Sequence, residues 1–231
     1  MPKKNGWYYA ATDAAGAYGW GSAGSALGPL GTAVGIVIGG VGTSAWNWYW
    51  DQPSIVYPPD DKFAQHFENL NQQVGFTHNK FIVEFVTDNV NKFKDSTDFA
   101  TALHNSLVNK ITATFSIAIQ DIESIFNDKK LVSDLDKFSP TFNETSDTSI
   151  FIEEIVSIVQ ENYKDDKIPS YFKKILIETA NAKNLEIETF FDTKIEEVKQ
   201  DKTLNELEQE IHFNALNTFK YALALWNRNV K

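Results

Sequence analysis

Residues 14–50 have the sequence AAGAYGWGSAGSALGPLGTAVGIVIGGVGTSAWNWYW, a run of 37 residues without a charged side chain. Glycine recurs in this run at four-residue spacings, as in Gly24–Gly28, Gly31–Gly35 and Gly35–Gly39. Residues four apart lie on one face of an α-helix. A row of glycines on such a face leaves a groove into which a second helix can pack closely. The spacing therefore predicts a glycine-rich helix, or a helical hairpin, whose packing groove is formed by Gly24, Gly28, Gly31, Gly35 and Gly39.

Tryptophan residues stand on both sides of the most apolar part of this run, residues 27–42. Trp20 precedes that part, and Trp46, Trp48 and Trp50 follow it. Tryptophan at both ends of an apolar segment is typical of a membrane interface, so these four residues are predicted interface anchors. A membrane span needs roughly 20 mostly apolar residues, and glycine costs about 1 kcal/mol in a helix interior. We therefore expect a marginal span, stabilised by oligomerisation or by insertion as a hairpin.

Three other interpretations of the same segment stay open at this point. It could be a secretory signal, although Lys3 and Lys4 lie far from the apolar core and the small-residue pattern at residues 43–45 is weak. It could be a glycine-rich helical hairpin buried inside a soluble fold or an oligomer. It could also be a flexible low-complexity tail, which the aliphatic residues and the tryptophans disfavour.

Charge divides the chain into two unequal parts. Lys3, Lys4 and Asp13 give the first 50 residues a net charge of +1. The formal net charge of the whole chain is −10, so residues 51–231 carry a net charge of −11. We predict a glycine-zipper hydrophobic segment at 1–50, a proline-containing linker at 51–60 and an acidic α-helical domain at 61–231. An acidic body with one arginine makes nucleic acid an unsuitable partner, because phosphate binding requires clustered lysine and arginine. The absence of cysteine excludes disulfides and thiolate metal sites.

The acidic part has few helix breakers, and its apolar residues recur every three or four positions. One such stripe runs from Phe99 to Phe126 and a second from Leu204 to Trp226, the latter opening with a capping box at Thr203 and Glu206. Gly75 is predicted to end an earlier helix. The expected fold class is all-α, with six or seven helices in the acidic domain.

Motifs for chemistry are missing from the sequence. The histidines at 66, 78, 104 and 212 stand apart from one another, and none has metal-ligand spacing. Residues 19–24 match G-x-G-x-x-G, but no β-branched strand precedes them and the next acidic residue is too distant for a dinucleotide site. The sequence predicts no catalytic residue, no metal site and no cofactor, and we expect the protein not to be an enzyme.

Residues 10–46 resemble the glycine-zipper segments of class II bacteriocins and other small secreted bacterial peptides, and their composition is similar to that of viral fusion peptides. The resemblance implies a segment that inserts into membranes or pairs with another peptide. We found no resemblance for residues 51–231. The lysine-, asparagine- and isoleucine-rich composition is typical of a low-G+C bacterial genome.

The leading hypothesis is a bacterial, membrane-associated or secreted protein that inserts into or permeabilises membranes, with lipid and copies of itself as partners and a further protein partner for the helical domain. The second hypothesis is a structural or assembly protein in which the glycine-rich segment packs between subunits.

Overall fold

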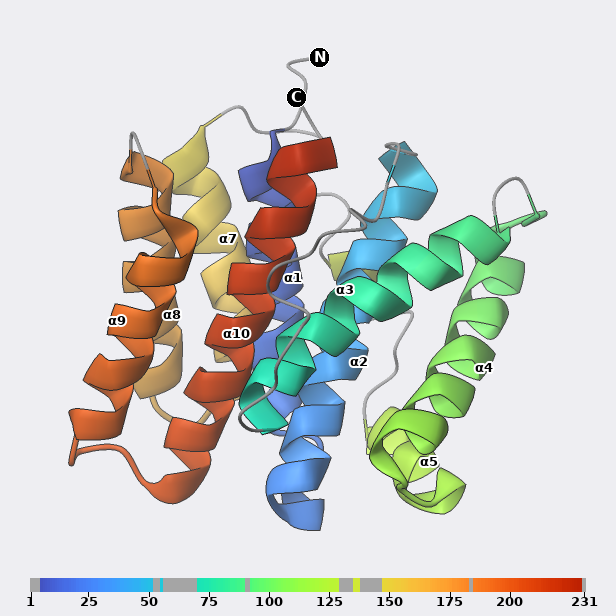
Figure 1. Cartoon of the computed structure of the whole chain (residues 1–231), viewed down its shortest axis with the longest axis horizontal. Helices are drawn as coiled ribbons and strands as arrows, with labels where there is room; N and C mark the ends of the chain where they lie inside the picture. Colours follow the sequence, from blue (N-terminus) through green and yellow to red (C-terminus); the bar gives the residue numbers. More distant parts are fainter. Residues whose placement is uncertain are drawn as a thin grey trace.

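The computed structural model describes residues 5–51, 55, 70–89, 92–128, 135–137, 147–182 and 185–229. These residues form helices and no strand, which confirms the predicted all-α class (Figure 1). The predicted linker at 51–60 and residues 61–69 lie almost entirely outside the described residues. In chain order the elements are α1 (Gly6–Gly21), η1 (Ser25–Leu27), α2 (Gly28–Asp51), α3 (Leu70–Asn89), α4 (Ser96–Phe115), α5 (Ile119–Asp128), α7 (Thr148–Gln160), α8 (Lys167–Asn181), α9 (Ile187–Gln200) and α10 (Glu206–Asn229).

Helices α1 and α2 form a hairpin, joined by the short 3-10 helix η1. The side chain of Asn5 begins α1 by accepting hydrogen bonds from the backbone N–H groups of Trp7 and Tyr8. Between η1 and α2 the chain reverses at Gly28, whose φ of +74° lies in a region that residues with a side chain rarely adopt. We call α1, η1 and α2 together the hairpin.

The hairpin lies at the centre of the bundle. Helix α10 packs along α1 and also meets α2, while α3 packs on α2 and α10 (Figure 1). Helices α7 and α8 contact α1, and α4 contacts α2. We call α3, α4, α7, α8 and α10 the sheath. The buried apolar residues of the hairpin and the sheath belong to one hydrophobic cluster. Residues 1–50 therefore supply the middle of the core rather than an appended segment.

The spacing of the apolar stripe from Phe99 to Phe126 suggested one continuous helix. In the structure this stripe is divided between two helices, α4 and α5. Helix α4 ends where Ser116 adopts a left-handed conformation with φ of 54°, and the Ser116 N–H donates to the carbonyl of Thr112. The chain then turns, and α5 packs against α4. The turn brings Phe126 against His104, with 4.5 Å between their ring centroids.

Two local predictions were also wrong, and each has a physical reason. Gly75 does not end a helix but lies within α3, where a Cβ atom would be 2.6 Å from the carbonyl oxygen of Asn217 on α10. The capping box of α10 lies two residues later than predicted. Asn205 and Glu208 form it, each side chain accepting from the other residue's backbone N–H.

Candidate functional site

The candidate site is the surface on which the hairpin meets itself and the sheath. Its first part is the line of glycines between α1 and α2. A Cβ atom at Gly39 would lie 2.1 Å from the carbonyl oxygen of Gly16, and one at Gly16 would lie 2.4 Å from the carbonyl oxygen of Gly39. Real Cβ atoms do not approach backbone oxygens so closely. The two helices therefore touch through their backbones, without side chains between them.

The remaining glycines of the predicted groove divide between contact and turn. A Cβ atom at Gly35 would lie 2.4 Å from the carbonyl oxygen of Trp20. Gly24 and Gly31 face each other beside the turn, where an added Cβ would approach the other's carbonyl oxygen to about 2 Å. Gly28 has nothing within 4 Å and serves the chain reversal instead. Four of the five predicted groove residues thus lie in contacts that α2 makes with α1 or with the turn of the same chain.

The four tryptophans expected at a membrane interface are placed differently from one another. Trp20, Trp46 and Trp48 are buried in the bundle, and Trp46 packs against Phe99 of α4 with ring centroids 5.6 Å apart. Only Trp50, near the end of α2, is exposed, at 55%. In this conformation the three buried tryptophans are not available to lipid.

A buried polar network fixes the hairpin to α3 and α10, and no motif in the sequence predicted it. The indole Nε1 of Trp226 on α10 donates to Oδ2 of Asp13 on α1, at 2.6 Å. The same carboxylate oxygen lies 3.5 Å from Nε2 of His78 on α3, and this nitrogen is 3.0 Å from Oγ of Ser44 on α2. Nδ1 of His78 donates to the side-chain oxygen of Asn79 at 2.9 Å. The network joins four helices through side chains without solvent exposure.

Ser44, His78 and Asp13 are the residue types of a hydrolytic triad, but their arrangement differs from one. In a triad the serine and the carboxylate bind opposite nitrogens of the imidazole ring. Here both face Nε2, and all three side chains are fully buried. The cluster therefore cannot present an activated serine to an external substrate, and its chemistry is that of a structural tie. Gly40 makes room for it, because a Cβ there would lie 3.0 Å from the His78 ring.

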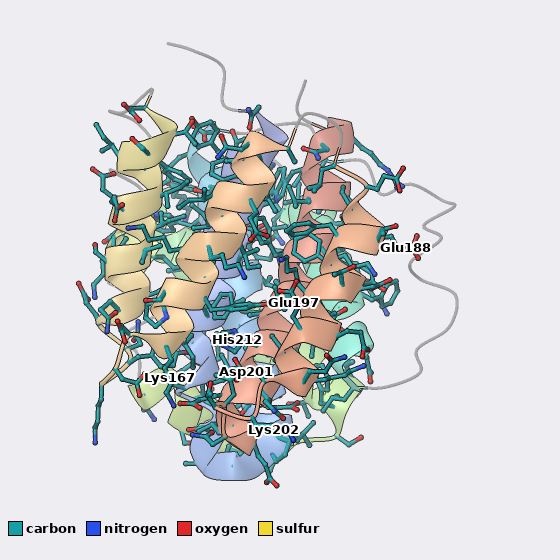
Figure 2. All side chains as sticks on the ribbon, turned by 90° about the vertical axis from the view of Figure 1, so that its left-hand side faces the viewer. Lys167, Glu188, Glu197, Asp201, Lys202 and His212 are labelled. Carbon is teal, nitrogen blue, oxygen red and sulfur yellow. The ribbon has the colours of Figure 1, made fainter. Side chains whose placement is uncertain are left out.

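A second buried histidine, His212, ties α10 to the other end of α1. Its Nδ1 lies 3.1 Å from the hydroxyl of Tyr18, and its ring packs edge-on against Tyr171 of α8. The hydroxyl of Tyr163 in turn donates to the backbone carbonyl of Tyr18 at 2.5 Å. Figure 2 shows His212 near Asp201, Lys167 and Lys202, at the end of the bundle where α10 begins. Nε2 of His212 has no hydrogen-bond partner among the described residues.

Burial shifts the titration of this second cluster. It lowers the pKa of His212 to about 4, and the nearby carboxylate of Asp201 opposes this shift only partly. Burial also raises the pKa of Tyr18, with smaller contributions from Tyr171 and Tyr163. The cluster is therefore uncharged at neutral pH.

Two pockets lie at another part of the bundle, and both include Leu185 and Asn227. Their volumes are about 420 and 340 Å³. Glu186, Glu188 and Arg228 are the charged residues in their linings, all in the larger pocket. No group of three potential metal ligands occurs among the described residues. His104 is paired with Glu123 on the surface, and His66 lies outside the described residues.

Comparison with protein-family models, with curated proteins and with solved structures finds no match to this chain. The function is therefore inferred from the geometry of the hairpin and its contacts with the sheath.

The glycine contacts predict opposite effects for two Gly→Ala substitutions. Gly39→Ala places a methyl group against the backbone of Gly16 and should lower the free energy of unfolding by about 2 kcal/mol or more. Gly19→Ala on α1 meets only the side chain of Asn162, at 3.5 Å, and should raise it by about 0.5–1 kcal/mol, because alanine favours a helix. Urea denaturation followed by circular dichroism measures both, and equal effects would contradict the backbone contact.

The buried network predicts that two Trp→Phe substitutions differ in cost. Trp226→Phe removes the hydrogen bond that α10 donates to the buried carboxylate of Asp13, which should cost about 1–3 kcal/mol beyond the change in packing. Trp46→Phe is the control, because the Trp46 indole N–H has no partner among the described residues. If the two variants lose equal stability in urea, the hydrogen bond to Asp13 is not important for the fold.

The lowered pKa of His212 predicts a specific loss of stability in acid. The unfolded chain protonates this histidine below a pKa of about 6.5, whereas the folded protein resists protonation down to about 4. Its contribution is therefore complete above pH 6.5 and is lost progressively as the pH falls to 4, by on the order of 3 kcal/mol. His212→Asn keeps a hydrogen-bonding group beside Tyr18 but cannot titrate. Its unfolding free energy should fall less than that of the wild type between pH 7 and 4.5.

Proposed function

We propose that this protein is membrane-active and non-enzymatic: a water-soluble acidic bundle that carries a hydrophobic helical hairpin and releases it into a lipid bilayer. The observation that carries the proposal is the location of the charge-free run, residues 14–50, which forms most of the central hairpin inside the sheath; Asp13 and Asp51 lie on the hairpin just outside this run. Transfer of this run would bring no ionised side chain into the hydrocarbon, where charges are costly.

The dimensions of α2 suit a membrane. Its 24 residues extend about 36 Å, compared with a hydrocarbon thickness of about 30 Å. Residues Ser25–Asp51 are long and apolar enough to cross a membrane by length and composition, and most of this span is buried in the bundle. A signal sequence or the core helix of a soluble protein has the same properties, so the function requires a direct test.

The glycine contacts support insertion of the hairpin as a unit. Helices in lipid associate through close packing, and small residues at their interface permit it. The contacts at Gly16, Gly35 and Gly39 lie within the hairpin, so they would remain intact when it leaves the sheath. In the closed bundle α1 already fills the groove. Oligomerisation through these same glycines would therefore require the two helices of the hairpin to separate after release.

Charge separates the two functional parts. The formal net charge is −10, and residues 14–50 contribute nothing to it. Residues 51–231 carry a net charge of −11 and are repelled by anionic lipid at neutral pH, so this part of the chain, which includes the sheath, would remain in water while the hairpin enters the membrane. Vesicles of zwitterionic phosphatidylcholine are the appropriate probe. Acid reverses the charge of the protein and would attract it to anionic lipid, whereas binding to a zwitterionic bilayer reports hydrophobic insertion alone.

The alternative is a structural or assembly protein in which the hairpin serves only as a core or as a subunit contact. It predicts a soluble species of defined mass that never sediments with lipid. Light scattering of the protein alone measures the mass, and centrifugation with vesicles measures whether the protein sediments with lipid.

An engineered disulfide provides the sharpest test of release. An ideal Cβ atom at Gly21 would lie 3.1 Å from Cγ1 of Ile36 and 3.4 Å from Cγ1 of Ile211, so side chains at positions 21 and 211 would be in contact, as a disulfide requires. The chain has no cysteine of its own. In the Gly21→Cys/Ile211→Cys protein the bond would tie the turn end of α1 to the start of α10. Insertion would then have to draw charged residues of α10, such as Glu208 and Glu210, into the bilayer.

We expect the oxidised double variant to release little dye from phosphatidylcholine vesicles between pH 7 and 4.5. The same sample should recover wild-type release, at least ten-fold greater, when dithiothreitol reduces the bond. Each single-cysteine variant, with and without the reductant, is the control for the substitutions themselves. Equal release from the oxidised and reduced forms, or no release from the wild type under any condition, would refute the proposed function.

A further inference from the structure

The turn end of the hairpin already reaches solvent. Ala26 is exposed and Leu27 is 39% exposed, whereas the helices on either side are almost entirely buried. An apolar turn is also the part of a hairpin that meets a bilayer first. Release therefore depends on what holds the neighbouring part of α1, from Tyr18 to Gly21, inside the bundle.

The element that holds this part of α1 is the start of α10. Ile211 lies against Gly21, and the next residue, His212, meets the hydroxyl of Tyr18. Several titratable or charged groups surround His212 from the elements packed against it. They are Tyr18 on α1, Tyr171 and Lys167 on α8, Tyr163 after α7, Asp201 between α9 and α10, and Glu208 one turn earlier on α10.

We propose that His212 is an acid-sensitive latch, which holds α10 against the turn end of the hairpin when neutral and releases it when protonated. This inference rests on the proposed function, because the latch would be the signal that frees the hairpin. The geometry itself concerns only the contact between α10 and α1.

A proton on His212 creates a charge that its present position cannot accommodate. The side chain is fully buried, and no described group accepts a hydrogen bond from Nε2. A buried unpaired charge is costly, and the cost falls when the group moves to water or to an opposite charge. The lowered pKa of His212 reflects the same cost.

Asp201 gives the motion a direction. This carboxylate attracts the charged imidazole and accepts hydrogen bonds from the N–H and hydroxyl of Thr203 at the surface. Movement of the start of α10 toward Asp201 and solvent would break the contact with Tyr18 and uncover Gly21. At the other end of α10, the bond from Trp226 to Asp13 remains, so the opening is local to the turn.

Hydrogen exchange without lipid tests the latch separately from membrane insertion. Protection factors, corrected for intrinsic rates, are measured at pH 7 and pH 4.5 for the amides of residues 18–27 in full-length protein. In the wild type, the protection factors of these amides should fall at least ten-fold more between pH 7 and pH 4.5 than those of the amides of residues 8–13. In His212→Asn the fall should be absent. His104→Asn, which removes a partly exposed histidine from α4, is the matched control and should behave as the wild type.

Asp201→Asn keeps a hydrogen-bond acceptor for Thr203 at an exposed site, so it should fold normally. It should shift the opening to lower pH by removing the charge that favours protonated His212. Opening of His212→Asn at the wild-type pH, or no shift in Asp201→Asn, would overturn the latch. Opening without dye release from vesicles would sustain the latch and refute the membrane function. If His212→Asn releases dye with the same pH dependence as the wild type, the membrane function is sustained and the latch is refuted.

Discussion

The contact between the backbones of α1 and α2 is the constraint on which the bundle depends. At Gly16 and Gly39 no side chain separates the two helices, so the hairpin is unusually thin for a pair of helices. Its larger residues, such as Tyr18 and Trp46, therefore project away from the pair and into the sheath. One thin apolar pair can thus be enclosed on several sides by the helices of a chain of only 231 residues.

The same closeness explains why histidines hold the hairpin in place. Asp13, Ser44 and Tyr18 lie on the hairpin and are fully buried, so their side chains depend on polar partners inside the bundle. The sheath supplies His78 and Trp226 toward one end of the hairpin and His212 toward the other. These polar ties are directional, whereas apolar packing is not, so they fix how the hairpin lies within the sheath.

Sequence periodicity predicted the all-α class, but it did not predict every helix end or which helices pack together. Glycine spacing predicted close helix packing, but it could not show that α1 of the same chain would fill the groove. The histidines looked isolated because their partners are distant in sequence: Ser44 is 34 residues from His78, and Tyr18 is 194 residues from His212. Ser116 breaks a regular apolar stripe because its left-handed conformation is a local feature that periodicity does not encode. Gly75 resembled a helix terminus although its role is close approach to α10.

The energetics of release follow from where the hairpin lies. A side chain such as Ile38 is fully buried in the bundle and would be equally removed from water in a bilayer, so its transfer changes the hydrophobic free energy little. The main cost of insertion is the loss of contacts that the sheath makes with the hairpin, together with exposure of the apolar faces of the sheath itself. The contacts between the sheath and the hairpin therefore control release, and the hydrophobicity of α2 does not. A group that changes charge within the contact, as His212 does, can therefore govern a segment that has no ionisable residue between Ala14 and Trp50 apart from its tyrosines.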